Sequence, residues 1–246
     1  MVYYLYGDVN KEEQVLEKQL ELFRTTEKSK WRLFLLHNED QHVLRNMERN
    51  GMLFDVASSA ECEAVAERNI KQCETSLMEG YENIPINFGS TDHVSAYLYG
   101  GHITQDVRVP IGVYKSGQKV GQVRNKVVTY EYTLPRLVEP LPKSELAKEN
   151  TWSTDERVLR QLRGSREFKK RIGLLNERAK WEKLRGTYYK GFTKKILEMG
   201  WSNNYLHSTL NQCVAKTGRL SSTNPNQQNL PDEARKLMVS RYDCSS

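Results

Sequence analysis

The sequence predicts a mainly α-helical fold with a small β part, on three observations. Residues 55–80 and 166–186 carry apolar side chains at intervals of three and four, the spacing of one helix face. The runs 106–114 and 126–132 are rich in β-branched and aromatic residues and flank a turn-rich segment, which predicts a β-hairpin. Residues 206–214 alternate between apolar and polar side chains, which predicts a half-buried strand.

Length and composition indicate a polar protein that can bury a core. A chain of 246 residues is long enough for one large or two modest domains. The mean hydropathy is −0.71, and no run approaches the roughly 18 apolar residues of a membrane helix. The N-terminus has neither the basic start nor the apolar core of a secretory signal. We therefore expect a cytoplasmic protein with no membrane partner.

The cysteines and histidines predict no metal site and no disulfide framework. The cysteines show no C-x-x-C spacing, and the five histidines are scattered; the cysteines are Cys62, Cys73, Cys213 and Cys244. Cys62 and Cys73 lie three helical turns apart, so we expect packed thiols on one helix face.

The net charge of +6 is unevenly distributed. Residues 157–195 contain fourteen Lys or Arg against three Glu, a local net charge of +11, which leaves −5 for the remainder. A basic segment beside a near-neutral remainder favours a polyanionic partner. The alternative is a solvated helix face without a ligand.

Capping patterns predict where several helices begin. Asn38 with Gln41 predicts the start of a helix that Gly51 ends, after an apolar run at 31–36. A helix that starts at Ser90 would point its free N–H groups towards a bound phosphate. Residues 153–156, Ser-Thr-Asp-Glu, form a second capping box whose helix ends at Gly164. Ordinary capping without a ligand is the alternative at both sites.

The segment that follows the predicted strand is dense in amides, hydroxyls and one guanidinium. Residues 217–231 read TGRLSSTNPNQQNLP, with few apolar side chains to pack. Side-chain amides and Arg reach acceptors on base edges and phosphates, so we interpret residues 218–229 as a functional loop.

This sequence resembles the entry to the palm domain of family A DNA polymerases, the bacterial polymerase I and bacteriophage group. The family pattern is T-G-R-L-S-S-x-x-P-N-L-Q-N-I-P, and this chain departs from it at Gln227 and Leu230. Leu230 conserves volume, whereas Gln227 puts a polar group where the family has an apolar one.

The resemblance implies the part of a polymerase that runs from the end of the exonuclease domain to the start of the palm. Residues 1–36 would end a 3′–5′ exonuclease-like domain, 37–200 would form the thumb, and 201–246 would begin the palm. The thumb would be two long antiparallel helices with a β-rich insertion at 104–148, and the predicted strand would be the first of an α+β palm. In the insertion, cations could extend a DNA-binding surface or dock a partner; they are Lys115, Lys119, Arg124 and Lys126.

The family's motifs also imply site residues. Tyr4-x-x-x-Asp8 resembles the third exonuclease motif, whose Asp binds a metal and whose Tyr positions water. INFGSTDH at 86–93 resembles the thumb-tip motif F-N-x-x-S-x-x-Q, which implies phosphate contacts by Asn87 and Ser90, with His93 replacing Gln.

Two further stretches carry the implied DNA contacts. KWEKLRGTYY at 180–189 resembles the stretch that holds the template-primer backbone, and implies contacts from Lys180, Lys183, Arg185 and Thr187. Arg219 would sense minor-groove acceptors at the primer end, which lie in nearly the same place for every correct pair. Asn226, Gln228 and Asn229 would hold the neighbouring minor groove and backbone.

The carboxylate motifs for nucleotidyl transfer are absent from this sequence. The family's D-Y-S-Q-I-E-L-R, H-D-E and R-x-x-x-K stretches do not occur, and we interpret Asp243 as a linker residue. We therefore expect a template-primer-binding segment that is inactive alone, whose Mg²⁺ ligands and remaining palm and fingers lie on a downstream polypeptide. Two alternatives stay open: a non-catalytic DNA-binding subunit or clamp, and a basic helical protein that binds RNA or a protein surface.

Overall fold

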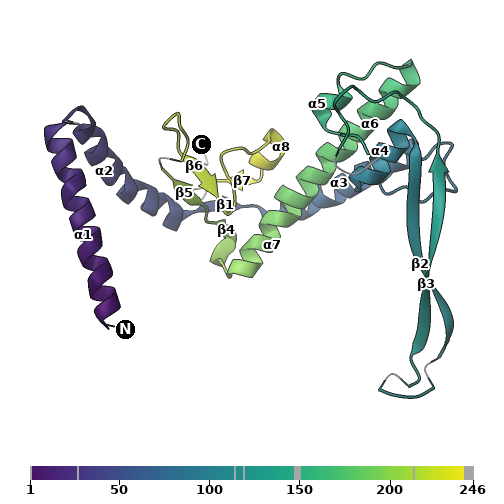
Figure 1. Cartoon of the computed structure of the whole chain (residues 1–246), viewed down its shortest axis with the longest axis horizontal. Helices are drawn as coiled ribbons and strands as arrows, with labels where there is room; N and C mark the ends of the chain where they lie inside the picture. Colours follow the sequence, from purple (N-terminus) through teal and green to yellow (C-terminus); the bar gives the residue numbers. More distant parts are fainter. Residues whose placement is uncertain are drawn as a thin grey trace. The chain divides into compact units, whose positions relative to one another are not determined.

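The computed structural model confirms the predicted fold class, since helices dominate and the strands form small antiparallel sheets (Figure 1). The structure describes residues 2–26, 28–113, 115–118, 120–146, 151–212 and 214–240, with the backbone alone for 2–9 and 28–29. The helices are α1 Val2–Thr25, α2 Lys28–Asn50, α3 Val56–Leu77, α4 Thr91–Tyr99, α5 Glu156–Leu159, α6 Arg166–Lys183, the π-helix η1 Leu184–Tyr189, α7 Lys190–Met199, the 3₁₀-helix η2 Ser202–Asn204 and α8 Asp232–Arg235. The strands are β1 Met52–Phe54, β2 Gly101–Val113, β3 Val123–Leu134, β4 Tyr205–Leu206, β5 Thr209–Asn211, β6 Ser221–Thr223 and β7 Met238–Val239.

The chain divides into two compact units. Unit 1 comprises Met1–Ala60 and Tyr188–Ser246, and unit 2 comprises Glu61–Thr187. The chain crosses between the units within α3 and within η1. Among the described residues, we find no helix with the length and apolar character needed to cross a bilayer.

In unit 1, a three-stranded antiparallel sheet carries the entry to the functional loop. Its order is β4-β1-β7, so the central strand β1 pairs with both others. Phe54 of β1 is buried and meets Phe192 of α7 edge to face at 5.6 Å. Beside β4 the chain turns into the two-stranded β5–β6 sheet. The predicted strand 206–214 is therefore wrong as one element, and part of the predicted loop is strand β6.

The break in that strand has a cause in α2. The Glu48 carboxylate accepts a 2.6 Å hydrogen bond from the Leu210 N–H, and its carbonyl lies 2.7 Å from His207 Nδ1. These contacts hold the chain at residues 207–210 against a helix, so it leaves the sheet after Leu206. Alternation along the sequence does not reveal such a contact, because Glu48 lies 162 positions from Leu210.

The predicted capping box at Asn38 is also wrong. Asn38 lies in the middle of α2, and its Nδ2 donates to the Phe34 carbonyl one turn earlier. Trp31 and Phe34 pack with Phe23 of α1 as an aromatic cluster, so tertiary contact carries the helix through the residue that resembled its start. Gly51 follows the last residue of α2 with φ +60, as predicted for a helix end.

Unit 2 contains the predicted antiparallel helices. Moving along α6 and η1, Arg171, Arg178 and Arg185 contact Leu77, Glu74 and Glu67 of α3 in reverse order. The order of these contacts confirms that α3 and α6 run antiparallel. The core between them and α4 includes Leu77, Phe88, Tyr97, Phe168 and Leu175.

The helix predicted to end near Gly186 continues instead. η1 leads into α7, and the apolar positions persist because Tyr188, Tyr189, Phe192 and Ile196 are buried.

The predicted capping box at 153–156 is wrong too. α5 begins after Asp155, which makes no side-chain capping bond, and Ser153 Oγ accepts a hydrogen bond from the Asp155 N–H instead. The helix spans four residues and stops before Gly164.

The predicted β-hairpin is confirmed as the antiparallel pair β2–β3. Its register runs from Gly101 opposite Leu134 to Val113 opposite Val123, with a bulge between Pro110 and Gly112. β2 begins earlier than the predicted 106–114, and β3 extends past both ends of the predicted 126–132. The base of the ribbon, where β2 begins and β3 ends, belongs to the core. Ile103 is 3% exposed and Leu134 is 2% exposed.

Candidate nucleic-acid interface

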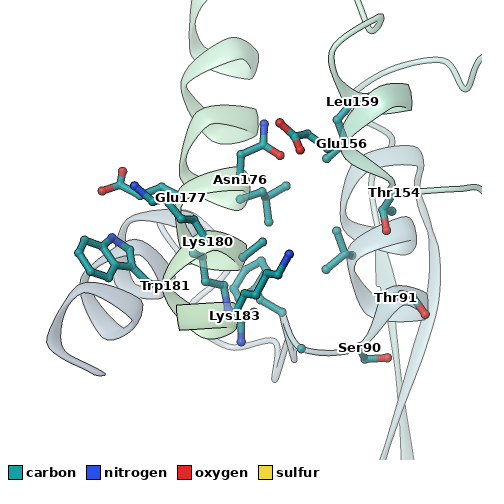
Figure 2. Close-up of a pocket in the computed structure, with 16 residues that line it drawn as sticks. Ser90, Thr91, Thr154, Glu156, Leu159, Asn176, Glu177, Lys180, Trp181 and Lys183 are labelled. Atoms are coloured by element: carbon teal, nitrogen blue, oxygen red, sulfur yellow. The ribbon is translucent and has the colours of Figure 1, made fainter. Parts of the chain in front are cut away.

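One pocket of unit 2 brings together two groups of residues that the sequence singled out. The α4–α6 pocket has a volume of about 800 Å³. Figure 2 shows Ser90 and Thr91 at the start of α4 on one wall, with Asn176, Lys180 and Lys183 of α6 on the other. Ser90 and Lys183 lie more than ninety positions apart in the sequence, so only the fold brings them to one cavity.

The start of α4 offers donors to this pocket. Ser90 is the N-cap residue with extended backbone angles, and its hydroxyl makes no capping hydrogen bond. The first N–H groups of a helix have no intrahelical acceptor and carry the positive end of the helix dipole. Asp92 in the first turn partly offsets that charge. The arrangement suits an anion near Ser90.

Asn87 shapes the loop before α4. Its Oδ1 accepts a 2.9 Å hydrogen bond from the Gly89 N–H, and its own N–H donates to His93 Nδ1 at 3.1 Å. The His that replaces the family's Gln therefore closes the loop onto the helix. Asn87 is exposed and keeps its side-chain NH₂ for an external acceptor.

Two hydrogen bonds hold the segment before α5, which forms a further edge of the pocket, against α4. The Tyr99 hydroxyl donates to the Ser153 carbonyl at 3.2 Å, and the Trp152 N–H donates to Ser95 Oγ at 2.8 Å. Burial raises the pKa of Tyr99 to about 12, so its hydroxyl remains a donor at neutral pH. This edge places Thr154 and Glu156 in the pocket.

The basic residues of α6 and η1 differ in whether they form ion pairs within the chain. Lys183 is exposed and makes no ion pair in the described part of the chain, and Lys180 Nζ lies 6.0 Å from the centre of the Trp181 ring. Arg185 is bound to Glu182 at 2.9 Å and to Glu67 at 3.4 Å. A phosphate at Arg185 would compete with both carboxylates. Thr187 is exposed on η1.

Arg171 is a supporting residue that sequence reasoning missed. Its guanidinium donates to the Leu77 and Glu79 carbonyls, both at 3.3 Å, and to the Tyr97 hydroxyl, and it lies over the rings of Tyr81 and Tyr97. Burial is the largest single influence and would lower the pKa of Arg171, but the hydrogen bonds to Tyr97 and Glu167 and the electrostatic interactions with Tyr97 and Tyr81 together outweigh it, so the pKa is raised. Its position three residues after the buried Phe168, on the apolar face of α6, was the available signal.

In unit 1, Gln227 holds the functional loop through both ends of its amide. Its Oε1 accepts a 3.1 Å hydrogen bond from Ser208, and its Nε2 donates to the Leu206 carbonyl at 3.3 Å. The Gln227 N–H also donates to Ser222 Oγ at 2.8 Å. The polar departure from the family pattern is therefore accommodated by hydrogen bonds, while Leu230 is buried as an apolar residue.

The remaining loop candidates are exposed. Asn226 Oδ1 accepts from the N–H groups of Gln228 at 3.1 Å and Asn229 at 3.4 Å, which tightens the turn. The Asn229 carbonyl accepts from the Tyr188 hydroxyl at 3.3 Å. Among the described residues, Arg219 has no hydrogen-bond or ion-pair partner, so its guanidinium is available to a ligand.

The structure does not test the residues of the exonuclease-like motif or the linker residue Asp243. Tyr4 and Asp8 lie in α1, where the structure describes the backbone alone, and Asp243 lies outside the described residues. Within the described ranges, no three His, Cys, Asp or Glu side chains are grouped so that they could hold a metal ion. The described residues therefore form no group that could hold the Mg²⁺ that the resemblance implies for a complete enzyme.

Comparison with known proteins confirms the resemblance over the second half of the chain. Residues 130–242 match the sequence model of DNA polymerase family A. DNA polymerase I of Bacillus caldotenax is 36% identical over 105 residues, 41% of this chain and 11% of that protein. DNA polymerase I of Treponema pallidum is 36% identical over 95 residues, 37% of this chain and 9% of that protein. The matched region belongs to DNA polymerase family A.

A solved structure supports the fold. The polymerase domain of Pol1 from M. smegmatis, in complex with DNA primer-template and dNTP, has a TM-score of 0.51 and 22% identity. The match covers 80% of this chain and 27% of that one. The chain thus spans about a tenth of the curated relatives it matches and about a quarter of this solved chain.

Proposed function

We propose that this chain is the template-primer-binding segment, thumb and palm entry, of a DNA-directed DNA polymerase that acts in DNA replication. The α4–α6 pocket carries the proposal, because it brings Ser90, Lys180 and Lys183 to one cavity. The family match over 130–242 supports the enzyme class, and the M. smegmatis protein holds a primer-template.

In this function, the pocket binds the sugar-phosphate backbone. The α4 N-terminus offers N–H donors, and the lysine ammonium groups supply charge. Each neutralised phosphate releases counterions, so affinity falls with salt whatever the DNA sequence. Asn87 adds an amide donor at the same end of α4.

The loop of unit 1 senses the primer end. Arg219 donates to minor-groove acceptors that every correct base pair presents in nearly the same place. Gln227 and Asn226 hold the loop in shape, and the exposed Gln228 and Asn229 contact the neighbouring groove and backbone. The loop thus detects pairing geometry without reading sequence.

Chemistry in the complete enzyme requires carboxylates that this sequence does not contain. Mg²⁺ would polarise the phosphoryl oxygens and activate the primer hydroxyl there. A second polypeptide region with the D-x-S-x-x-E-L-R motif would supply its ligands. The contribution of the present chain is to hold and orient the primer-template.

The test is binding of a fluorescent primer-template to the purified chain over a range of KCl concentrations. Lys183→Ala should weaken binding about equally for all sequences and lower the salt slope by roughly one unit. The control is Lys18→Ala, which removes the same charge from an exposed position on α1.

Two results would contradict the proposal. Equal salt slopes for Lys183→Ala and Lys18→Ala would mean that α6 is a solvated helix face. Stronger binding to double-stranded RNA than to the primer-template would favour an RNA-binding protein instead.

A further inference from the structure

The β2–β3 ribbon continues well beyond the core that anchors its base (Figure 1). Ile103 and Leu134 at the base are buried, whereas Ile111, Val113 and Val123 are 51%, 53% and 57% exposed. At roughly 3.4 Å per residue, the stretch from residue 105 to residue 113 reaches about 30 Å. We call residues 107–128 the ribbon tip.

The ribbon tip is basic and contains no acidic residue. Its 22 residues hold five Lys or Arg and neither Asp nor Glu. Four of these cations are described, all are exposed, and none has an ion-pair partner among the described residues; they are Arg108, Lys115, Arg124 and Lys126. The ribbon's carboxylates lie nearer its base, where Asp106 accepts from Thr129 and Glu131 contacts His102. The positive charge of the tip is therefore uncompensated.

The valines of the tip have a structural explanation that the cations lack. A two-stranded ribbon with no sheet behind it depends on β-branched residues and on contacts between paired strands. Val107 lies opposite Val128, and Val109 lies opposite Lys126. The exposed valines thus stabilise the ribbon without a partner, whereas the four described cations raise the electrostatic self-repulsion of the tip.

We propose that the ribbon tip is a second DNA-binding surface, which contacts the phosphate backbone of the duplex independently of sequence. A two-stranded ribbon fits the major groove of B-DNA, and cations along both strands then face phosphates. The inference rests on the proposed function, since DNA is the ligand in both. The tip adds phosphate contacts to those of the α4–α6 pocket, so the complex tolerates higher salt.

The experiment compares two double variants that remove equal charge. Arg124→Gln with Lys126→Gln changes the tip, and Lys11→Gln with Lys18→Gln changes exposed positions on α1. Binding of a primer-template with a long duplex is measured by fluorescence anisotropy over a range of KCl. The tip variant should lower the salt slope by about two units and the affinity about ten-fold, with a much smaller effect of the control.

A second tip variant, Arg108→Gln with Lys115→Gln, should lower the salt slope by the same amount, and far-ultraviolet circular dichroism should be unchanged in every variant. If both tip variants have the same affinity and salt slope as the α1 control, the ribbon binds no DNA and its cations serve another partner, such as an acidic protein. A lower affinity and salt slope in the tip variants but not in Lys183→Ala would support DNA binding by the ribbon and contradict DNA binding by the α4–α6 pocket. A lower affinity and salt slope in Lys183→Ala alone would support DNA binding by the pocket and overturn the proposal that the ribbon binds DNA.

Discussion

Gln227 illustrates how much a single residue reveals before the fold is known. Its departure from the family pattern was visible in the sequence, but its partners Ser208 and Leu206 lie about twenty positions away. A polar residue at an apolar position predicts either a defect or a new hydrogen bond. The fold decides between them, because β4 brings the two partners to the amide.

Replacing Gln227 by Leu, the residue of the family pattern, should destabilise this chain. The change removes the hydrogen bonds to Ser208 and Leu206 and leaves polar groups of two buried residues without these partners. The expected cost is about 1–2 kcal/mol. Urea unfolding measures the difference. The matched control is Gln228→Leu, an exposed neighbour, which should change stability by about 0.5 kcal/mol or less. Equal stability of the two variants would contradict the account.

Arg219 is the residue with the most specific proposed role. In a polymerase assembled with its catalytic part, Arg219→Ala removes a charge-assisted contact made only to a seated primer end. Such bonds contribute about 1.5–3 kcal/mol, so extension should slow roughly 10- to 100-fold while DNA affinity changes less. Single-turnover extension and binding assays separate the two effects. If affinity fell as far as in Lys183→Ala at an unchanged extension rate, Arg219 would be one more phosphate contact.

At the scale of elements, long periodic segments were predictable, whereas local signals were correct at Gly51 and Ser90 and wrong elsewhere. α3 and the ribbon were confirmed because each repeats one pattern over many residues. The capping box at Asn38 and the strand 206–214 failed because tertiary contacts, with Phe23 of α1 and with Glu48 of α2, outweighed them. The α4–α6 pocket combines two predicted groups, but their meeting required the antiparallel packing of α3 and α6.

That packing depends on Arg178, which is 11% exposed and donates to Glu74 at 2.7 Å. Arg178→Ala leaves the half-buried Glu74 carboxylate without this partner and should cost about 1.5–3 kcal/mol. Arg160→Ala serves as the control, because its ion pair with Glu156 is exposed and contributes about 0.5 kcal/mol. Thermal unfolding of both variants should show the larger loss for Arg178→Ala. Equal losses would show that the α3–α6 ion pair is not structural.

At the scale of the whole molecule, the boundaries of the compact units differ from the boundaries of the predicted functional parts. The units change within α3 and η1, whereas the predicted boundaries at 36/37 and 200/201 follow the family's domains. Those boundaries stay a prediction. The resemblance to the family was accessible from residues 217–231, because a motif of that length needs no fold to be identified.

The central claim is that this chain holds DNA for chemistry performed elsewhere in the polymerase. Templated primer extension with dNTPs and Mg²⁺ tests it most directly, with the chain alone, with a polypeptide carrying D-x-S-x-x-E-L-R alone, and with both together. We expect no extension by the chain alone and extension by the mixture above the level of the catalytic polypeptide. Extension by the chain alone would contradict the claim, and a mixture no more active than the catalytic polypeptide would favour a clamp.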